Sequence, residues 1–347
     1  MTKQTDKPIL RHIRCLRLRH VSSSCRACVN SCPHGAIGFV DGQPVLYPSE
    51  CTACGLCSTA CPQEAIFIQP GDEALFEKFK TTLLKPVITF RCSHTKRNPE
   101  DINIECFGAL NPSFILLAKA IQNHSISFIQ GNCETCGKNL DCNPAQDLAT
   151  QCSALAQWAG TNLQITVEQQ ALEVDGRRRA FFSGFMERIP ETSVQQPTEE
   201  KIDPETPAKQ IPPNHLRLLT ALRLLKGESP LSTQPEALHD HFKQPEISQE
   251  CTGCAFCISM CPTGALQVKK EGEEMVIGLN RGACTSCGLC RDVCYTNAVQ
   301  LKAVNRCEDL YNADPVILFR NKVKSDLLDE CWEDKIGKMF DVPIYRS

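Results

Sequence analysis

Apolar residues fall into short separate pieces along this chain rather than into one long repeating pattern. The pieces at 65–68 and 265–268 each follow a polar turn and predict a short strand. Between them, PVITF at 86–90 and ISFIQ at 126–130 predict buried strands, and residues 112–122 have the apolar spacing of a helix. Strand, helix and strand in this order predict a small α/β domain.

A polar, proline-rich segment follows this middle region. Residues 190–214 are rich in Pro, Glu, Gln and Thr and poor in apolar residues, which is typical of an extended linker. Directly after it, leucines recur on one face of a predicted helix, with Asn214 as its N-cap and Gly227 as its stop. The residues expected on that face are Leu216, Leu219, Leu222 and Leu225, or near neighbours of these. We therefore expect a linker that contains one amphipathic helix.

Two regions of the chain repeat each other. Residues 25–68 contain CRACVNSCPHGAI and CTACGLCSTACPQEAIFI, and residues 251–301 contain CTGCAFCISMCPTGALQV and CTSCGLCRDVCYTNAVQL. Two similar modules thus bracket a different middle. The expected domains are an N-terminal module at 1–80, an α/β domain at 86–172, the linker with its helix at 186–245, a C-terminal module at 246–305 and a tail at 306–347.

The amount and grouping of cysteine change this picture. The 347 residues include 24 cysteines in tight runs, which in a chain of this length indicates metal ligation rather than disulfides. A net charge of -3 without a long block of like charge gives little support to a nucleic-acid partner. The N-terminus lacks the apolar stretch of a secretory signal, and no apolar run approaches the roughly 20 residues of a membrane-spanning helix. We expect a cytoplasmic protein without a transmembrane segment, for which peripheral docking to a membrane complex stays open.

The spacing inside the runs indicates iron and sulfur. Three cysteines in steps of three, then a fourth four residues on and followed by proline, match the run of bacterial ferredoxins. There the first three thiolates bind one [4Fe-4S] cubane and the fourth binds the neighbouring one, whereas zinc sites use two separated cysteine pairs. This crossing rule predicts, in the C-terminal module, one cluster on Cys251, Cys254, Cys257 and Cys294 and another on Cys261, Cys284, Cys287 and Cys290. Tyr295 replaces the proline after Cys294, a departure that alters the turn without removing a ligand.

One run of the N-terminal module lacks its first cysteine. The crossing rule supplies one full set, which is Cys32, Cys51, Cys54 and Cys57. The other set has Cys25, Cys28 and Cys61, with Ser22 where the fourth ligand should fall. We expect Cys15 as the displaced ligand, because the intervening chain is long enough to fold back to one corner of a cubane. The alternative is a three-cysteine site that holds a [3Fe-4S] cluster, or a [4Fe-4S] cluster with an open or oxygen-ligated iron.

These runs resemble the two-[4Fe-4S] ferredoxins and the polyferredoxin subunits built from them, over roughly residues 15–68 and 248–302. The resemblance implies a ferredoxin-like βαββαβ fold in each module and one-electron transfer as the activity. The expected fold class is therefore α+β, with two two-cluster modules flanking a small α/β domain.

The middle region carries cysteines of its own. Cys92 and Cys133 each follow a predicted strand, and Cys106 opens the loop before the predicted helix. The ends of parallel strands gather at one edge of a sheet, where sites form. Together with Gly108 and Pro112, these cysteines resemble the delta subunit of methyl-viologen-reducing hydrogenase, which implies a [2Fe-2S] cluster.

The fourth ligand of that centre is open. The resembling family has its next cysteine five positions after Cys133, whereas here Cys136 and Cys142 follow, and we include Cys142 in the expected set. The alternatives are structural zinc on Cys133, Cys136 and Cys142, or no metal, and His94 and His124 could substitute as ligands. We interpret Cys152, Cys307 and Cys331 as ordinary thiols.

The cysteine runs supply redox cofactors, while motifs for a substrate pocket are missing. The sequence has no phosphate loop, no GxGxxG after a strand and no radical-SAM run. We expect a non-catalytic electron-transfer subunit of an oxidoreductase complex, which relays single electrons through several [4Fe-4S] clusters between a redox enzyme and another carrier. Three clusters have full ligand sets and a fourth depends on Cys15. The alternatives are a catalytic oxidoreductase subunit that uses the incomplete cluster or the middle-domain centre, and a redox-sensing or scaffold protein.

Overall fold

The computed structural model describes residues 8–68, 71–83, 85–122, 125–136, 138, 140, 142–170, 209–227, 230–238, 241–272, 274–311 and 315–322. Most of the predicted linker, the end of the predicted tail, His124 and Cys331 lie outside the described residues. The chain divides into two units. Unit 1 comprises Met1–Arg11, Ala27–Ser153 and Asn162–Glu205, and unit 2 comprises His12–Arg26, Ala154–Thr161 and Thr206–Ser347.

The first cysteine-rich region of unit 1 runs in the order strand, helix, strand, strand, helix, strand. Its outer strands β1 (Pro8–Leu10) and β4 (Ile66–Ile68) pair antiparallel, and so do β2 (Ile37–Val40) and β3 (Gln43–Leu46). In sequence, the short helix α2 (Ala27–Asn30) lies between β1 and β2, and α3 (Leu56–Ala60) lies between β3 and β4. The two helices contact each other. The strand predicted after the cysteine run is confirmed as β4, and buried Ile37, Cys57 and Ile66 form a small core.

The middle of unit 1 is a parallel sheet with the strand order β6-β5-β7-β8. Its strands are β5 (Val87–Cys92), β6 (Ile102–Ile104), β7 (Ser125–Gln130) and β8 (Ile165–Gln169). Both predicted strands are thereby confirmed, as β5 and β7, and they pair in parallel from Val87 and Ser125 onward. Their carboxyl ends therefore lie at the same edge of the sheet.

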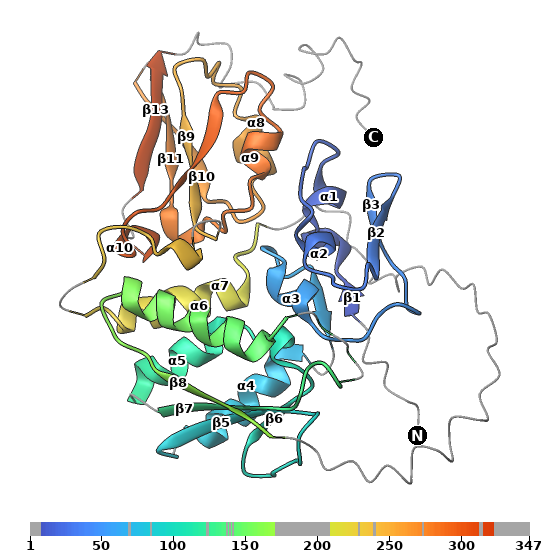
Figure 1. Ribbon diagram of the computed structural model, residues 1–347. Helices are drawn as coiled ribbons and strands as arrows, with labels where there is room; N and C mark the ends of the chain where they lie inside the picture. The colour runs from blue at the N-terminus through green and yellow to red at the C-terminus, as the bar shows by residue number, and fades with distance from the viewer. Residues whose placement is uncertain are drawn as a thin grey trace. The chain divides into compact units, whose positions relative to one another are not determined.

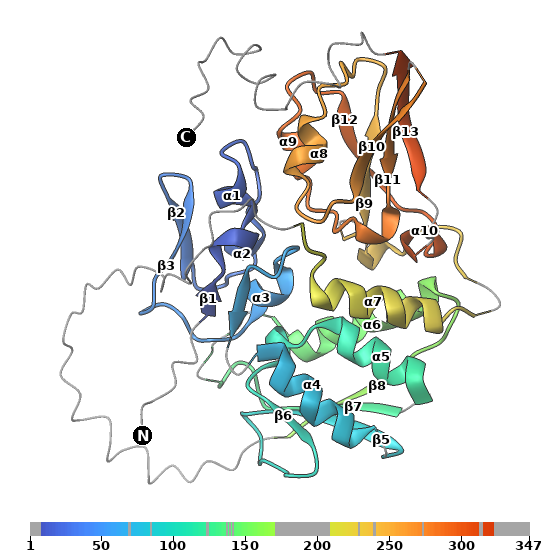
Figure 2. The same ribbon diagram turned by 180° about the vertical axis from the view of Figure 1, so that it is seen from behind.

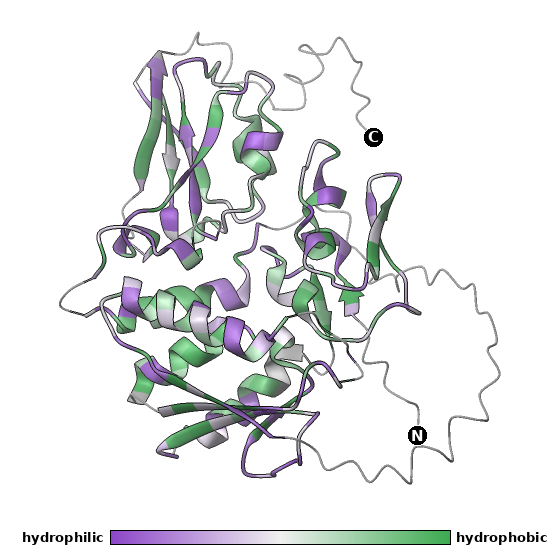
Figure 3. Ribbon diagram, viewed as in Figure 1, coloured by the Kyte–Doolittle hydropathy of each residue, from purple (hydrophilic) through white to green (hydrophobic). Residues whose placement is uncertain are grey.

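Two helices supply the apolar cover of this sheet. α4 (Gly71–Thr82) and α5 (Pro112–Gln122) lie over one face of it in Figure 1. α5 has the predicted bounds and buries Phe114, whose ring meets that of Phe79 from α4 edge-on at 6.2 Å. Hydrophobic residues dominate α5, β5 and β7 in Figure 3, because these elements are covered on most sides. Each fully buried phenylalanine contributes roughly 1.5–3 kcal/mol to the hydrophobic stabilisation. A further helix, α6 (Pro144–Trp158), leads to β8.

The second cysteine-rich region, in unit 2, repeats the order strand, helix, strand, strand, helix, strand. β9 (Lys243–Ile247) pairs antiparallel with β12 (Val299–Ala303), and β10 (Leu266–Glu271) pairs antiparallel with β11 (Glu274–Leu279). The helices α8 (Phe256–Met260) and α9 (Leu289–Asp292) lie side by side, as Figure 2 shows. This unit also contains two short 3-10 helices, η3 (Glu236–Leu238) and η4 (Arg281–Ala283). Leu16, from the N-terminal segment with η1 (His12–Arg14) and α1 (Leu16–Arg19), joins the buried core of this region.

The region expected to be a tail contributes regular structure. It forms α10 (Glu308–Tyr311) and the strand β13 (Val316–Lys322). β13 pairs antiparallel with β11, so that a three-stranded sheet of order β10-β11-β13 results. Phe319 of β13 is buried and lies opposite Ile277 of β11.

The amphipathic helix after the linker is confirmed as α7 (Pro213–Leu224), with two corrections. Leu219, Leu222 and Leu225 are buried, but Leu216 is 47% exposed and does not belong to the packed face. Asn214 is not the N-cap, since the cap is Pro212 and the helix starts at Pro213. Proline suits that first position, because its fixed φ is already helical and its missing N–H would have no partner there.

None of the helices within the described residues has the length and apolar character that crossing a membrane would require.

Candidate metal centres

The complete cysteine set of the N-terminal module gathers around one pocket in unit 1. The lining of this pocket includes Cys32, Cys51, Cys54 and Cys57. Apolar Ile37 and Leu46 from the β2–β3 hairpin form part of the remaining wall. Burial, followed by the negative charge of Cys54, Cys51 and Cys32, raises the pKa of Cys57 to about 12. The four thiols predicted to bind one cluster thus face the same enclosed space.

The backbone of the cysteine loop is shaped for this convergence. Ala53 and Gly55 both take the left-handed conformation, with φ of 54° and 87°, and α3 begins directly after Gly55. A left-handed alanine costs on the order of 1 kcal/mol and persists only where the surroundings impose it. The equivalent loops of the C-terminal module place Ala255 and Ser286 in the same conformation. Each loop can therefore point its successive cysteines toward one centre.

Main-chain donors in the same module point at sulfur. The N–H of Ala36 donates to Cys32 Sγ at 3.2 Å, and the N–H of Ala65 donates to Cys61 Sγ at 3.2 Å. Cys32 and Cys61 are the last cysteines of their runs, and each is followed by proline. The turn after each run therefore directs a main-chain N–H at the sulfur of the last cysteine. Such hydrogen bonds stabilise a thiolate and raise the reduction potential of a cluster bound to it.

In the C-terminal module the first crossed set comes together. Burial, followed by the charges of Cys254, Cys251 and Cys294, raises the pKa of Cys257 to about 12. Cys254 and Cys294 also act on Cys251, whose pKa is raised mainly by burial. Cys294 thus lies with the loop that starts more than forty residues before it in sequence, as the crossing rule predicted. Tyr295, which replaces the usual proline, shares a 2.7 Å hydrogen bond between its hydroxyl and Thr252 Oγ1.

The second crossed set of this module also converges. Burial, then Cys287 and Cys284, raises the pKa of Cys290 strongly, and Cys257 of the first set and Cys261 add to that rise. Burial raises the pKa of Cys284 to about 12, with contributions from Cys287 and Cys261. The eight cysteines of this module thus lie close enough to act on one another, while their division into two crossed sets and the ligation itself stay predictions.

The four cysteines predicted to bind the other cluster of the N-terminal module belong to different units. Cys15 and Cys25 belong to unit 2, whereas Cys28 and Cys61 belong to unit 1. Within unit 2, burial raises the pKa of Cys15 and the charge of Cys25 adds to the rise. Arg17 Nε donates to the main-chain oxygen of Cys25 at 2.9 Å, which fixes the chain between the two cysteines. Cys15 as the fourth ligand stays a prediction.

The middle domain forms a second cysteine pocket in unit 1. Cys92 at the end of β5, Cys133 after β7 and Cys106 before the 3-10 turn η2 (Phe107–Ala109) line it together, as the parallel sheet predicts. Cys136 also lines this pocket. Cys142 does not and is exposed, although its charge still acts on Cys133. The lining also includes His94.

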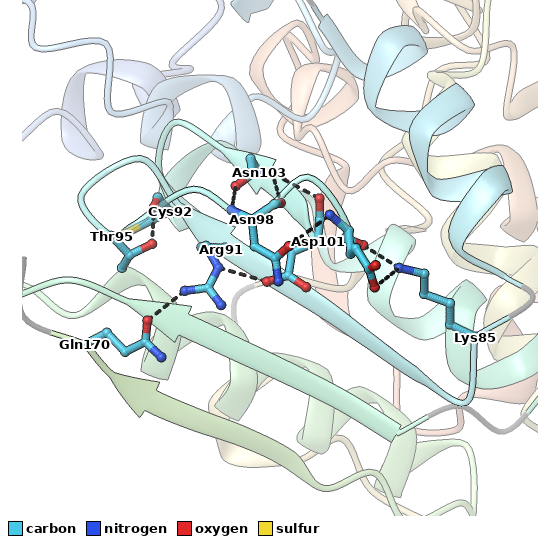
Figure 4. Close-up of polar contacts among 9 residues, drawn as sticks. Lys85, Arg91, Cys92, Thr95, Asn98, Asp101, Asn103 and Gln170 are labelled. Carbon is cyan, nitrogen blue, oxygen red and sulfur yellow. Dashed lines mark hydrogen bonds and ion pairs between the residues drawn. The ribbon is translucent and has the colours of Figure 1, made fainter.

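Main-chain and side-chain contacts fix this second pocket. The N–H of Gly131 donates to Cys92 Sγ at 3.2 Å, and the N–H of Gly108 donates to Cys106 Sγ at 3.4 Å. Thr95 Oγ1 donates to the oxygen of Cys92 at 2.8 Å (Figure 4). Burial raises the pKa of Cys106 to about 12. Two of the pocket's thiols, Cys92 and Cys106, thus accept a main-chain hydrogen bond, and Cys106 is buried.

A buried ion pair supports the strand end that carries Cys92. Arg91 Nε donates to Asp101 Oδ2 at 2.8 Å, and Arg91 Nη1 donates to Gln170 Oε1 at 2.7 Å (Figure 4). Both charged side chains are nearly buried, with 9% and 12% of their surface exposed, so removal of one partner would leave an uncompensated charge. The pair joins β5 to the loop before β6 and to the end of β8.

The donor sets fit iron–sulfur clusters. Each pocket is lined by four thiols, and burial raises the pKa of Cys57 in the first pocket and of Cys106 in the second to about 12. Iron cations would supply the charge that stabilises the thiolates there. In the first pocket the buried hydroxyl Oγ1 of Thr52 has no hydrogen-bond partner among the described residues, so it is available to a bound cluster. Within the described part of the chain, no three Cys, His, Asp or Glu side chains are arranged to hold a single metal ion.

Sequence reasoning missed two charged residues next to the thiols. Lys138 lines the middle-domain pocket, and its charge opposes the rise in the pKa of Cys106. Arg19 lies near Cys261 and Cys287 of the C-terminal module. Neither belongs to a motif, and each is brought to the cysteines by tertiary contacts, so the sequence held no local signal for them.

A comparison with known protein families matches both cysteine-rich regions. A family described as the 4Fe-4S dicluster domain matches residues 23–65 and 250–298. No curated protein and no solved structure matches the chain. The matched segments contain the cysteine runs of both modules and leave the middle domain unmatched. Together with the converging cysteine sets, the two matches support a ferredoxin-like iron–sulfur protein with [4Fe-4S] clusters.

Proposed function

We propose that this protein is a non-catalytic electron-transfer subunit that relays single electrons between a redox enzyme and another carrier. The observation that carries the proposal is one small core of the C-terminal module in which Cys257 and Cys261 are buried, with cysteines of both runs packed against it. Two clusters that share one small core are close enough to exchange electrons, which is the arrangement of a relay. When bound, the clusters supply one-electron redox chemistry without bond making.

The residues of the chain have three tasks in this function. The cysteines hold the clusters, and the N–H groups of Ala36 and Ala65 stabilise thiolate sulfurs. The apolar walls, such as Ile37 and Leu46 in the N-terminal module, keep water from the clusters and so set the potential together with those hydrogen bonds. Cys15, Cys25, Cys28 and Cys61 stay the proposed ligands of the remaining cluster of that module.

We also propose an iron–sulfur centre in the middle domain, held by Cys92, Cys106, Cys133 and Cys136. The support is that these four line one pocket, whereas exposed Cys142 lies outside its lining. Structural zinc is the rival occupant. A [2Fe-2S] centre suits four thiolates enclosed at the edge of a sheet, as the resemblance to the hydrogenase delta subunit implies.

The test is anaerobic purification of the full chain and measurement of iron, acid-labile sulfide and zinc per chain. Four cubanes bring iron to about 16, slightly more with a [2Fe-2S] centre, with sulfide near parity and no zinc. Iron of about 8 to 12 with stoichiometric zinc would mean that the middle domain is structural or the N-terminal module is incomplete, and would contradict a continuous relay through all modules. The protein should also accept electrons from a one-electron dye while turning over no small substrate, whereas substrate turnover by the purified chain would favour the catalytic alternative.

Single substitutions then test the crossed sets. Cys261→Ser and Cys294→Ser should each perturb a different cluster of the C-terminal module, visible as the loss or alteration of a different signal in electron paramagnetic resonance (EPR) spectra. Cys307→Ser is the matched control, since Cys307 is buried but belongs to no set and should leave the iron content unchanged. Loss of the same signal in both variants would contradict the crossing.

A further inference from the structure

The two cysteine pockets of unit 1 share a wall. Cys54 lines the pocket of the N-terminal module, and Cys106 lines the pocket of the middle domain. Both residues are buried, 9% and 8% exposed, in one apolar cluster together with Leu140 and with Leu56 packed against it. A thiol from each pocket therefore lies in the same patch of core.

The main chains behind these two thiols are in close contact. Thr59 Oγ1 donates to the oxygen of Gly108 at 3.0 Å. A Cβ atom on Gly108 would lie 2.8 Å from the oxygen of Cys54, and one on Gly55 would lie 2.3 Å from Cβ of Ala109. Both distances are shorter than a side chain tolerates, so glycine is required at both positions. The cysteine loop of the N-terminal module and the Cys106 loop thus touch backbone to backbone.

Lys138 reaches from one pocket to the other. It lines the middle-domain pocket, and its Nζ donates to the main-chain oxygens of Thr52 and Ala53 at 2.9 and 3.2 Å. Those two residues lie between Cys51 and Cys54 in the cluster loop of the N-terminal module. The main-chain oxygen of Lys138 in turn accepts from His34 Nε2 at 2.6 Å. One ammonium group is therefore fixed at the wall between both cysteine sets.

We propose that the cysteine sets of the N-terminal module and the middle domain form one coupled pair, in which electrons cross at Cys54 and Cys106 and Lys138 is the shared positioning residue. This inference rests on the proposed middle-domain centre. In the step, the centre held by Cys54 loses one electron and the centre held by Cys106 gains it, with no bond or proton transferred. Because a ligand of each centre lies in the same patch of core, the distance that an electron crosses between the two centres is short. The ammonium group of Lys138 favours the more negative, reduced state of both centres.

The role of Lys138 is tested on reduction potentials rather than on activity. Lys138→Met in the full, anaerobically purified chain should shift the potentials of both unit 1 centres to lower values in an EPR-monitored redox titration. Lys138→Arg keeps the charge and should restore both potentials most of the way. Lys85→Met is the matched control, because Lys85 also donates to a main-chain oxygen, that of Glu100, but precedes β5, at the end opposite Cys92 (Figure 4).

The wild-type chain provides a second readout that needs no variant. Two paramagnetic centres in contact through their ligands should split or broaden each other's EPR signals in the fully reduced protein. Wild-type protein with both signals but neither this interaction nor a response to Lys138→Met would overturn the coupling alone. Wild-type protein that lacks the iron and the signal of the middle domain would overturn the proposed middle-domain centre and the coupling with it.

Discussion

Arg19 Nε donates a 2.9 Å hydrogen bond to the main-chain oxygen of Met260, the residue before Cys261. Burial lowers the pKa of Arg19, while the charges of Cys261 and Cys287 raise it, and a guanidinium stays protonated in proteins. The N-terminal segment thereby adds a half-buried positive charge to the second cysteine set of the C-terminal module.

Replacement of Arg19 should lower one reduction potential. In Arg19→Met, the centre at Cys261, Cys284, Cys287 and Cys290 should lose roughly 1 kcal/mol of stabilisation of its reduced state, because a nearby cation is gone. An EPR-monitored titration measures this shift, and Arg19→Lys should reverse part of it. Arg14→Met serves as the control, since Arg14 bonds an exposed Gln210 instead. An unchanged potential in Arg19→Met would disprove this role.

Two neighbouring cysteines of the middle domain should behave differently. Cys136→Ser should remove or alter the middle-domain centre, because Cys136 lines its pocket. Cys142→Ser should retain the iron and the spectrum, because Cys142 is exposed and outside the lining. Iron content and EPR spectra of the two variants decide between them. The reverse result would restore the ligand set that the sequence favoured.

The unpartnered hydroxyl of Thr52 should tune the cluster of the N-terminal module. Thr52→Val keeps the shape of the side chain and removes the buried Oγ1, which has no partner among the described residues. If that hydroxyl donates to a cluster sulfur, its loss should destabilise the reduced cluster by about 1 kcal/mol and so lower the reduction potential. Thr52→Ser should behave like the wild type. Thr81→Val, at an exposed hydroxyl bonded to the oxygen of Lys78, controls for generic effects in a titration of all three variants.

The stability of unit 2 should fall at mildly acidic pH because of His215. Its Nε2 donates to the oxygen of Gly282 at 2.9 Å, and burial lowers its pKa below 6.5. The unfolded chain then binds a proton more readily than the folded chain, so this stability is present above about pH 6.5 and is lost below it, by at most about 1.4 kcal/mol per pH unit.

Denaturant unfolding at pH 7.5 and 5.5 under anaerobic conditions checks this prediction. His215→Gln should lose less stability between the two pH values than the wild type does, because glutamine does not titrate. Equal losses in both proteins would assign the acid sensitivity to other groups.

The sequence predicted the elements whose signals are local. The helix at Pro112–Gln122 had the expected bounds, since proline starts it and its apolar spacing is regular. The crossed assignment of Cys261 and Cys294 also follows from spacing, because a short loop can wrap only one cluster, and it stays a prediction. Leu216 failed as a core residue because helical periodicity alone does not define how wide the covered face is.

Other features depend on tertiary contacts that no local pattern reveals. Cys136 and Cys142 are equally plausible ligands by type, and only the folded loop separates their positions. The sequence does not distinguish Lys138 from other lysines, and only the folded chain shows that its Nζ donates to the main-chain oxygens of Thr52 and Ala53. The region named a tail contains the strand β13, which pairs with β11, a partner distant in sequence.

The strand β13 determines how far the chain can be shortened from its C-terminal side without exposing an edge of the sheet. It pairs with β11 along most of the length of that strand, from Glu274 opposite Lys322 to Leu279 opposite Val316. A fragment that ends at residue 305, after the last cysteine run, would contain every ligand of the C-terminal module but would leave one edge of β11 with unpaired N–H and C=O groups. Such open edges recruit other chains and promote aggregation. Fragments made to isolate the C-terminal clusters should therefore extend through Lys322.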